Sequence, residues 1–210
     1  MSTTSTPSLP SWFARAVVEA ALIVFAVVLG FVVNEWREGL ADRHAANAAM
    51  VRVVAEIESN IEQLESVVDY HEAVVQRIDE RLAEIALAPE SGRGVLFDAF
   101  PVILPRGVNA PGLSRFAWDH AQQHGKLDVL PYEQVAGIAR LYAMQDSGVE
   151  ATWRQIVELI FAGPQVMREQ ELEASLRFTR IGFVELAAQE RFLIERSGRL
   201  LDDLRTQIDD

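Results

Sequence analysis

The chain has 210 residues, no cysteine and a net charge of −12. The lack of cysteine excludes disulfides, thiolate metal sites and cysteine nucleophiles. The acidic balance argues against nucleic acid as a partner, because binding to phosphates requires a basic surface. Outside one long apolar run, about 175 residues remain, which is enough for one domain with a modest core.

The apolar run covers residues 16–33 (AVVEAALIVFAVVLGFVV) and contains one ionisable residue, Glu19. A helix of this length spans roughly 27 Å, close to the thickness of the hydrocarbon core of a bilayer. Trp12 and Phe13 precede the run and Trp36 follows it, and aromatic side chains are typical of both membrane interfaces. The pattern predicts a single transmembrane helix embedded in the lipid bilayer.

This region divides the chain into three parts. Residues 1–11 are rich in Ser, Thr and Pro and have no apolar periodicity, which predicts a flexible tail. Residues 12–38 hold the transmembrane anchor with its interfacial flanks, and residues 39–210 form the extramembrane domain. No small-x-small cleavage site follows the run directly, so we expect an uncleaved anchor rather than a signal peptide.

Two features of the span favour contact with another membrane helix. A carboxylate within a span, here Glu19, costs free energy unless it reaches the interface or a partner, and snorkelling toward the headgroups is the alternative explanation. Ala26 and Gly30 form a small-xxx-small step that lets two helices approach closely. The candidate contacts to lipid or to a partner are Trp12, Phe13, Glu19, Ala26, Gly30, Asn34 and Trp36.

After the span, apolar residues recur at alternating steps of three and four, the heptad pattern of an amphipathic helix with a buried seam. The seam residues are Met50, Val54, Ile57, Ile61, Leu64, Val68, Val75, Ile78, Leu82 and Ile85. His71 takes the remaining seam position; we expect a partly exposed structural histidine, the alternatives being a register device or a pH-sensitive group. The pattern predicts a helix over residues 40–87, roughly 70 Å long, with Gly39 as the one plausible hinge to the span.

The rest of the chain predicts a loop and three further helices. Pro101 interrupts the apolar stretch 95–104, so we expect residues 89–112 to form a loop at the far tip of the long helix. Further helices are expected over residues 115–124, 131–161 and 165–208, bounded by Gly125, by Pro131 and by Gly163-Pro164. The last of these keeps the three-four apolar rhythm and is nearly as long as the first.

These elements predict an all-α fold. A lone helix with a long apolar seam is unstable in water, so its seam must be covered by the last helix, by another copy of the chain, or by both. We therefore expect a single N-terminal transmembrane helix that continues into a long antiparallel helical hairpin or bundle, with short cap helices at its far end.

No catalytic constellation is evident. His120 and His124 lie four residues apart on one predicted helix face, which is a possible metal spacing, but the sequence offers no obvious third ligand and an ordinary helix end explains His124 equally. The chain contains no nucleophile elbow, P-loop or dinucleotide fingerprint. We therefore expect no catalytic residues, no metal, no cofactor and no enzymatic activity.

Several motifs together resemble a family of functionally uncharacterised bacterial single-span membrane proteins. The resemblance lies in Glu19, the apolar run and residues 34–38 (NEWRE) at the membrane exit. It continues in residues 55–60 (AEIESN), 114–119 (SRFAWD) and 125–127 (GKL). The resemblance implies no activity. It implies structural roles for Trp118, as the core anchor of a short helix, and for Trp36, at the interface.

The resemblance also bears on topology, because members of the family often carry a basic tail before the span. That tail implies an N-terminus inside the cell and a periplasmic domain, and we favour this arrangement in the bacterial inner membrane. A strict count of positive charges gives the opposite orientation, because only Arg15 precedes the span whereas Arg37, Arg43 and Arg52 follow it.

Two classes of function fit these observations. The first is a non-catalytic accessory subunit that braces a larger respiratory, photosynthetic, transport or envelope complex through other membrane subunits or through self-association. The alternative is a membrane-tethered sensor or adaptor whose helical domain binds a ligand or a protein partner.

Overall fold

The computed structural model describes residues 11–92, 94, 96–125, 127–161 and 172–209. Within these ranges the chain contains helices and no strand. The elements are α1 (Ser11–Leu87), the 3₁₀ turn η1 (Pro89–Gly92), α2 (Leu96–Ile103), α3 (Phe116–Gln123), α4 (Tyr132–Met144), the π-helical segment η2 (Gln145–Glu150), α5 (Ala151–Phe161) and α7 (Leu172–Asp209). The all-α fold and the single long apolar helix near the N-terminus are confirmed.

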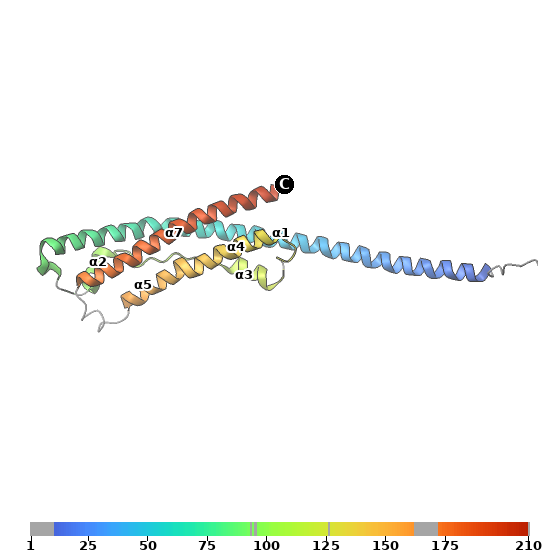
Figure 1. Ribbon diagram of the computed structural model, residues 1–210, viewed down its shortest axis with the longest axis horizontal. Coiled ribbons are helices and arrows are strands. Elements are labelled where there is room, and N and C mark those ends of the chain that lie inside the picture. The colour runs from blue at the N-terminus through green and yellow to red at the C-terminus, as the bar shows by residue number, and fades with distance from the viewer. Residues whose placement is uncertain (1–10, 93, 95, 126, 162–171, 210) are drawn as a thin grey trace, which may run out of the picture.

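The first helix, α1, is one uninterrupted rod of 77 residues, about 115 Å long at the usual helical rise. It passes Gly39 without a break, so the structure has no hinge at that position. Its N-terminal part projects away from the bundle in Figure 1 (blue), and the described side chains of residues 15–44 are all exposed. By length and composition, this part of α1 is apolar enough to cross a membrane.

The bundle forms where α7 packs along the second half of α1 (Figure 1). Ion pairs along this contact join residues in reversed order, so the two helices run in opposite directions. These pairs are Glu58–Arg205, Glu72–Arg191 and Asp79–Arg180. They are exposed and contribute little to stability; the apolar seam between the helices, which includes Ile57, Leu64, Ile78, Phe183, Leu186 and Leu204, is buried.

Residues 132–161 form one helical rod that packs against α7. The predicted helix over residues 131–161 begins and ends close to where the structure has it. It is not a regular α-helix throughout, because six residues at η2 adopt wider, π-helical geometry. The sequence carries no periodicity signal for this widening. Of the predicted last helix, α7 covers residues 172–209, and residues 165–171 lie outside the described part.

The expectation of a loop over residues 89–112 is wrong for its central part, where α2 forms with Pro101 inside it. A proline inside a helix removes one hydrogen bond and costs about 3 kcal/mol. Leu96 and Ile103 at the two ends of α2 are 4% and 1% exposed. Burial of these side chains offsets the cost of the proline, since each fully buried aliphatic side chain contributes about 1.5–3 kcal/mol.

Trp118 lies in the core, where the sequence analysis expects it. Its side chain is 2% exposed, and its ring stacks on Tyr142 of α4 with centroids 5.7 Å apart and an interplanar angle of 13°. This contact joins α3 to α4, in addition to the packing of α3 against α1.

Replacing the Trp118 ring tests how much its burial stabilises the fold. We expect Trp118→Ala to lower the free energy of unfolding by about 3–5 kcal/mol, because it removes a large buried side chain and leaves a cavity. Thermal unfolding followed by circular dichroism measures the effect. Trp36→Ala is the matched control, since Trp36 is 68% exposed; equal melting temperatures for the Trp118 variant and the parent would contradict the assignment.

Candidate functional site

The segment that connects α2 to α3 has little regular structure and is held against α1 by polar side chains. We call residues 104–115 the strap. The Tyr70 hydroxyl donates to the Gly107 carbonyl at 2.6 Å. Asn60 pairs with both backbone groups of Ser114: its amide nitrogen donates to the carbonyl at 2.7 Å and its side-chain oxygen accepts from the backbone N–H at 2.8 Å. These bonds satisfy backbone N–H and carbonyl groups that have no hydrogen-bond partner within a helix, because the segment is not helical.

His71 makes the most deeply buried contact with the strap. Its side chain is fully buried together with that of Glu190 on α7. One ring nitrogen, Nδ1, lies 2.9–3.0 Å from the two Glu190 oxygens, and Nε2 lies 2.9 Å from the Val108 carbonyl oxygen. The Phe183 ring packs against the imidazole with centroids 5.6 Å apart. Three segments, α1, α7 and the strap, therefore meet at one imidazole.

The hydrogen bonds of His71 determine how many protons the pair holds. A carbonyl oxygen only accepts, so the bond to Val108 requires a hydrogen on Nε2. The contact between Nδ1 and the Glu190 carboxyl group requires a second hydrogen, carried by one group or the other. In either arrangement the pair holds two protons and has no net charge. This neutrality is what makes its complete burial tolerable.

The expectation of a partly exposed His71 is wrong. The heptad pattern placed His71 in the seam, but a seam position is fully buried only when the facing helix and a covering segment are both present. Here α7 supplies Glu190 and the strap supplies the Val108 carbonyl. Both nitrogens are thus satisfied inside the core, and solvent is not needed to satisfy either of them.

A second polar side chain of α1, Glu56, binds the N-terminus of α3. Its carboxylate accepts hydrogen bonds from the backbone N–H groups of Ala117 (2.9 Å) and Trp118 (3.3 Å) and from the hydroxyls of Ser114 and Tyr142 (both 2.7 Å). Burial by itself raises the pKa of Glu56, but these four hydrogen bonds outweigh it and the pKa lies below the ordinary value. Burial and the bond to Glu56 raise the pKa of Tyr142.

The polar network extends from α1 to the π-helical segment. Asn60 donates to the side-chain oxygen of Gln145 at 3.2 Å, and Gln145 donates to Glu150 at 3.0 Å. Gln145 is 3% exposed, at the first residue of η2. A π-helical widening is energetically unfavourable and occurs often at functional sites. Here it gives Gln145 a buried position from which it links α1 to the start of α5.

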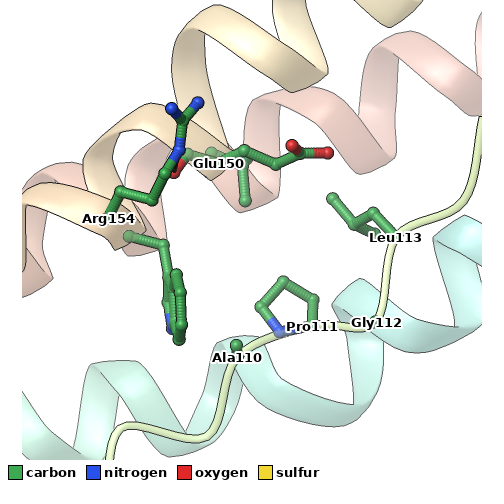
Figure 2. A pocket seen from close by; sticks show the side chains of 8 residues that line it. Ala110, Pro111, Gly112, Leu113, Glu150 and Arg154 are labelled. Atoms are coloured by element: carbon green, nitrogen blue, oxygen red, sulfur yellow. Dashed lines mark hydrogen bonds between the residues drawn. The ribbon is translucent and has the colours of Figure 1, made fainter. Parts of the chain in front are cut away.

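A cavity lies beside this network, between the strap and the start of α5 (Figure 2). Its volume is about 290 Å³, and it is lined by Ala110, Pro111, Gly112, Leu113, Val149, Glu150, Trp153 and Arg154. The walls are mostly apolar, and Trp153 has a buried indole nitrogen with no hydrogen-bond partner in the described part of the protein. The volume is at the lower end for small-molecule pockets.

The candidate contacts of the span do not gather into a site within one chain. Glu19, Ala26, Gly30 and Trp36 are exposed, and a Cβ built on Gly30 would meet no other part of the chain within 4 Å apart from its own turn of α1. Asn34 is likewise exposed and donates to Glu38 one turn later at 2.7 Å. The side chains of Trp12 and Phe13 lie outside the described part of the structure.

The two neighbouring histidines of α3 contact each other rather than a third polar group. The ring centroids of His120 and His124 are 4.2 Å apart, and His124 Nδ1 lies 2.9 Å from the His120 carbonyl oxygen. Across the described ranges, no group of three or more potential ligand side chains is placed to hold a metal ion.

The sequence analysis missed two of the residues that organise this region. Glu190 follows Phe183 and Leu186 and precedes Leu193 at the same three-four spacing, so a carboxylate in an apolar seam was a visible signal for a buried partner. Glu56 lies in residues 55–60, one of the stretches that carry the family resemblance, but no periodicity marked it, because it is one of many acidic residues on the outer face of the predicted helix.

Comparisons with protein-family models, with curated proteins and with solved structures find no match to this chain.

The burial of the His71–Glu190 pair predicts an asymmetry between single and double substitutions. We expect His71→Leu to lower the free energy of unfolding by about 3–5 kcal/mol, because it leaves a buried carboxylate without its partner. The double variant His71→Leu/Glu190→Leu should recover a large part of this loss, because it removes both polar groups. Urea unfolding measures both values, and a double variant no more stable than the single one would contradict the pairing.

The lowered pKa of Glu56 predicts a dependence on pH. A carboxyl group whose pKa is lower in the folded state stabilises the fold above its ordinary pKa of 4.5, and this contribution disappears as the pH falls through the folded-state value. We expect Glu56→Gln to be less stable than the parent at pH 7 and the difference to shrink below pH 4.5. Paired melting curves at pH 7 and at low pH test this; a difference that grew on acidification would overturn it.

Proposed function

We propose that this chain is a non-catalytic, membrane-anchored accessory subunit that braces a larger membrane protein complex. The proposal is supported chiefly by the continuity of α1. One helix contains the exposed apolar stretch at its start and, from Ala46 onward, residues of the bundle core. A helix without a hinge transmits position rigidly, so the anchor and the bundle act as one body.

The distance between bilayer and bundle also supports a bracing role. Between Trp36 and the first buried residue, Ala46, α1 is a single exposed helix of about ten residues, roughly 15 Å long. The chain thus holds its bundle at a set height above the interface. A subunit that had only to be retained at the membrane would need no such spacer.

The span supplies the contacts to the partner complex in this proposal. Glu19 and the small residues Ala26 and Gly30 have no partner of their own chain among the described residues. A second membrane helix that packs against the small residues would lie close to α1 and offer Glu19 a polar contact. We place the protein in the bacterial inner membrane, with the bundle on the periplasmic side.

Electrophoresis of gently solubilised membranes under native conditions tests the bracing role. We expect the chain to co-migrate with a large complex, and Glu19→Leu/Gly30→Leu to abolish co-migration without releasing the chain from the membrane. Val28→Leu is the control, because it changes the span by one methylene and leaves both residues in place. Co-migration that survives the double substitution would contradict docking through this face.

Protease accessibility in spheroplasts tests the orientation. Digestion of the bundle in intact spheroplasts is expected for a periplasmic domain; protection until the membrane is lysed would place the bundle in the cytoplasm.

A sensor or adaptor is the second candidate, and the cavity between the strap and α5 is the observation that favours it. In that case a small molecule bound beside Trp153 would displace the strap, which is hydrogen-bonded to α1. The same native electrophoresis separates the two candidates, since a sensor migrates without a large complex.

A further inference from the structure

Helix α7 carries a second apolar face that the bundle does not use. We call it the α7 stripe: Phe178, Ile181, Val184, Ala188 and Phe192, which recur at steps of three and four and therefore lie along one side of the helix. Phe178, Ile181, Val184 and Phe192 are 67%, 63%, 42% and 52% exposed.

The stripe is on the opposite side of α7 from the core. The buried residues Phe183, Leu186 and Leu193 face α1 and the α4–α5 rod, and at 100° per residue their mean direction is roughly opposite to that of Ile181 and Ala188. The stripe is therefore not part of the core of a single chain. An apolar face of this extent on a water-exposed helix marks an interaction surface.

We propose that the stripe is the interface between two copies of this chain, paired about a two-fold axis parallel to the rods. The inference rests on the proposed membrane anchoring, because a shared bilayer gives both copies the same polarity and the same height. Each stripe residue then lies at the level of its own equivalent, as an isologous dimer requires. Tethering in the plane also raises the effective concentration of the second copy.

The apolar area of the stripe is close to the non-polar area that such a dimer needs. From the exposed fractions, the four large side chains present roughly 400 Å² per copy. A standard interface buries about 800 Å² per partner, of which a little over half is non-polar. Complete burial of the stripe would therefore supply most of the non-polar area of such an interface, and residues on its flanks would supply the rest.

A groove beside the stripe offers a place for a ring of the second copy. It lies between α1 and α7, has a volume of about 420 Å³, and is lined by Glu72, Val75, Gln76, Val184, Ala187, Ala188 and Arg191. In a parallel helix pair, residues that flank the seam face partner residues about five positions away. Phe192 of one copy thus comes to the level of Ala187 in the other, at this groove.

The carboxylate closest to the stripe is turned away from it. Glu185 accepts a hydrogen bond from Gln189 at 2.7 Å, and the Gln189 side chain lies against Gly148 of η2. This bond draws the Glu185 carboxylate toward Gln189, on the next turn of its own helix, and away from the line of Ile181 and Ala188 along which the two copies meet.

The absence of cysteine from the chain makes a direct crosslinking test possible. Single variants Ile181→Cys and Ala188→Cys of the full chain in membranes should form disulfide-linked dimers under mild oxidation. Phe116→Cys is the control, because Phe116 is 77% exposed on α3 and lies outside the stripe. Equal crosslinking at all three positions, or none at 181 and 188, would overturn the pairing.

A second variant tests the same surface without cysteine. We expect Ile181→Glu to stop differently tagged copies from co-purifying, with an unchanged circular dichroism spectrum because the side chain is exposed within a single chain. Retained co-purification overturns the pairing. If carbonate extracts the parent chain from membranes, the proposed anchoring is wrong, whatever the crosslinks show. If the chain stays in the membrane but its stripe cysteines crosslink to a different protein, the pairing is wrong and the anchoring stands.

Discussion

The structure depends on the neutral buried pair of His71 and Glu190. Each of these groups alone would be a costly polar group in an apolar seam, and together they have two protons, no net charge and a carbonyl acceptor for the remaining nitrogen. A shift of α7 along α1 by one turn would separate them and leave both without partners. The pair therefore sets the register of the two long helices in a way that their apolar residues, which are similar at every turn, do not.

The same pair positions the segment on which the smaller helices depend. Val108 of the strap is bound by His71, and Ser114 at the other end of the strap is bound by Asn60. With the strap along α1, the N-terminus of α3 lies at Glu56, and the Trp118 ring stacks on Tyr142. Side chains of α1 thus hold both the strap and the N-terminus of α3 in place.

The two faces of α7 give the molecule its asymmetry. One face is covered by α1 and the α4–α5 rod, and the other exposes the α7 stripe. The exposed apolar stretch at the start of α1 and the α7 stripe lie on different helices, and both leave apolar side chains uncovered within a single chain.

Three features could be predicted from the sequence because their pattern is local: the apolar run, the three-four rhythm of α1 up to Leu87, and the three-four rhythm of the long last helix. The core position of Trp118 was expected from the family resemblance, and no periodicity pointed to it. The sequence did not determine the helical state of α2, because the cost of Pro101 is offset only by burial against distant residues. Likewise, only the tertiary structure brought Glu190 to His71 and Glu56 to α3, since hydrogen bonds between residues 119 and 61 positions apart leave no periodic trace in the chain.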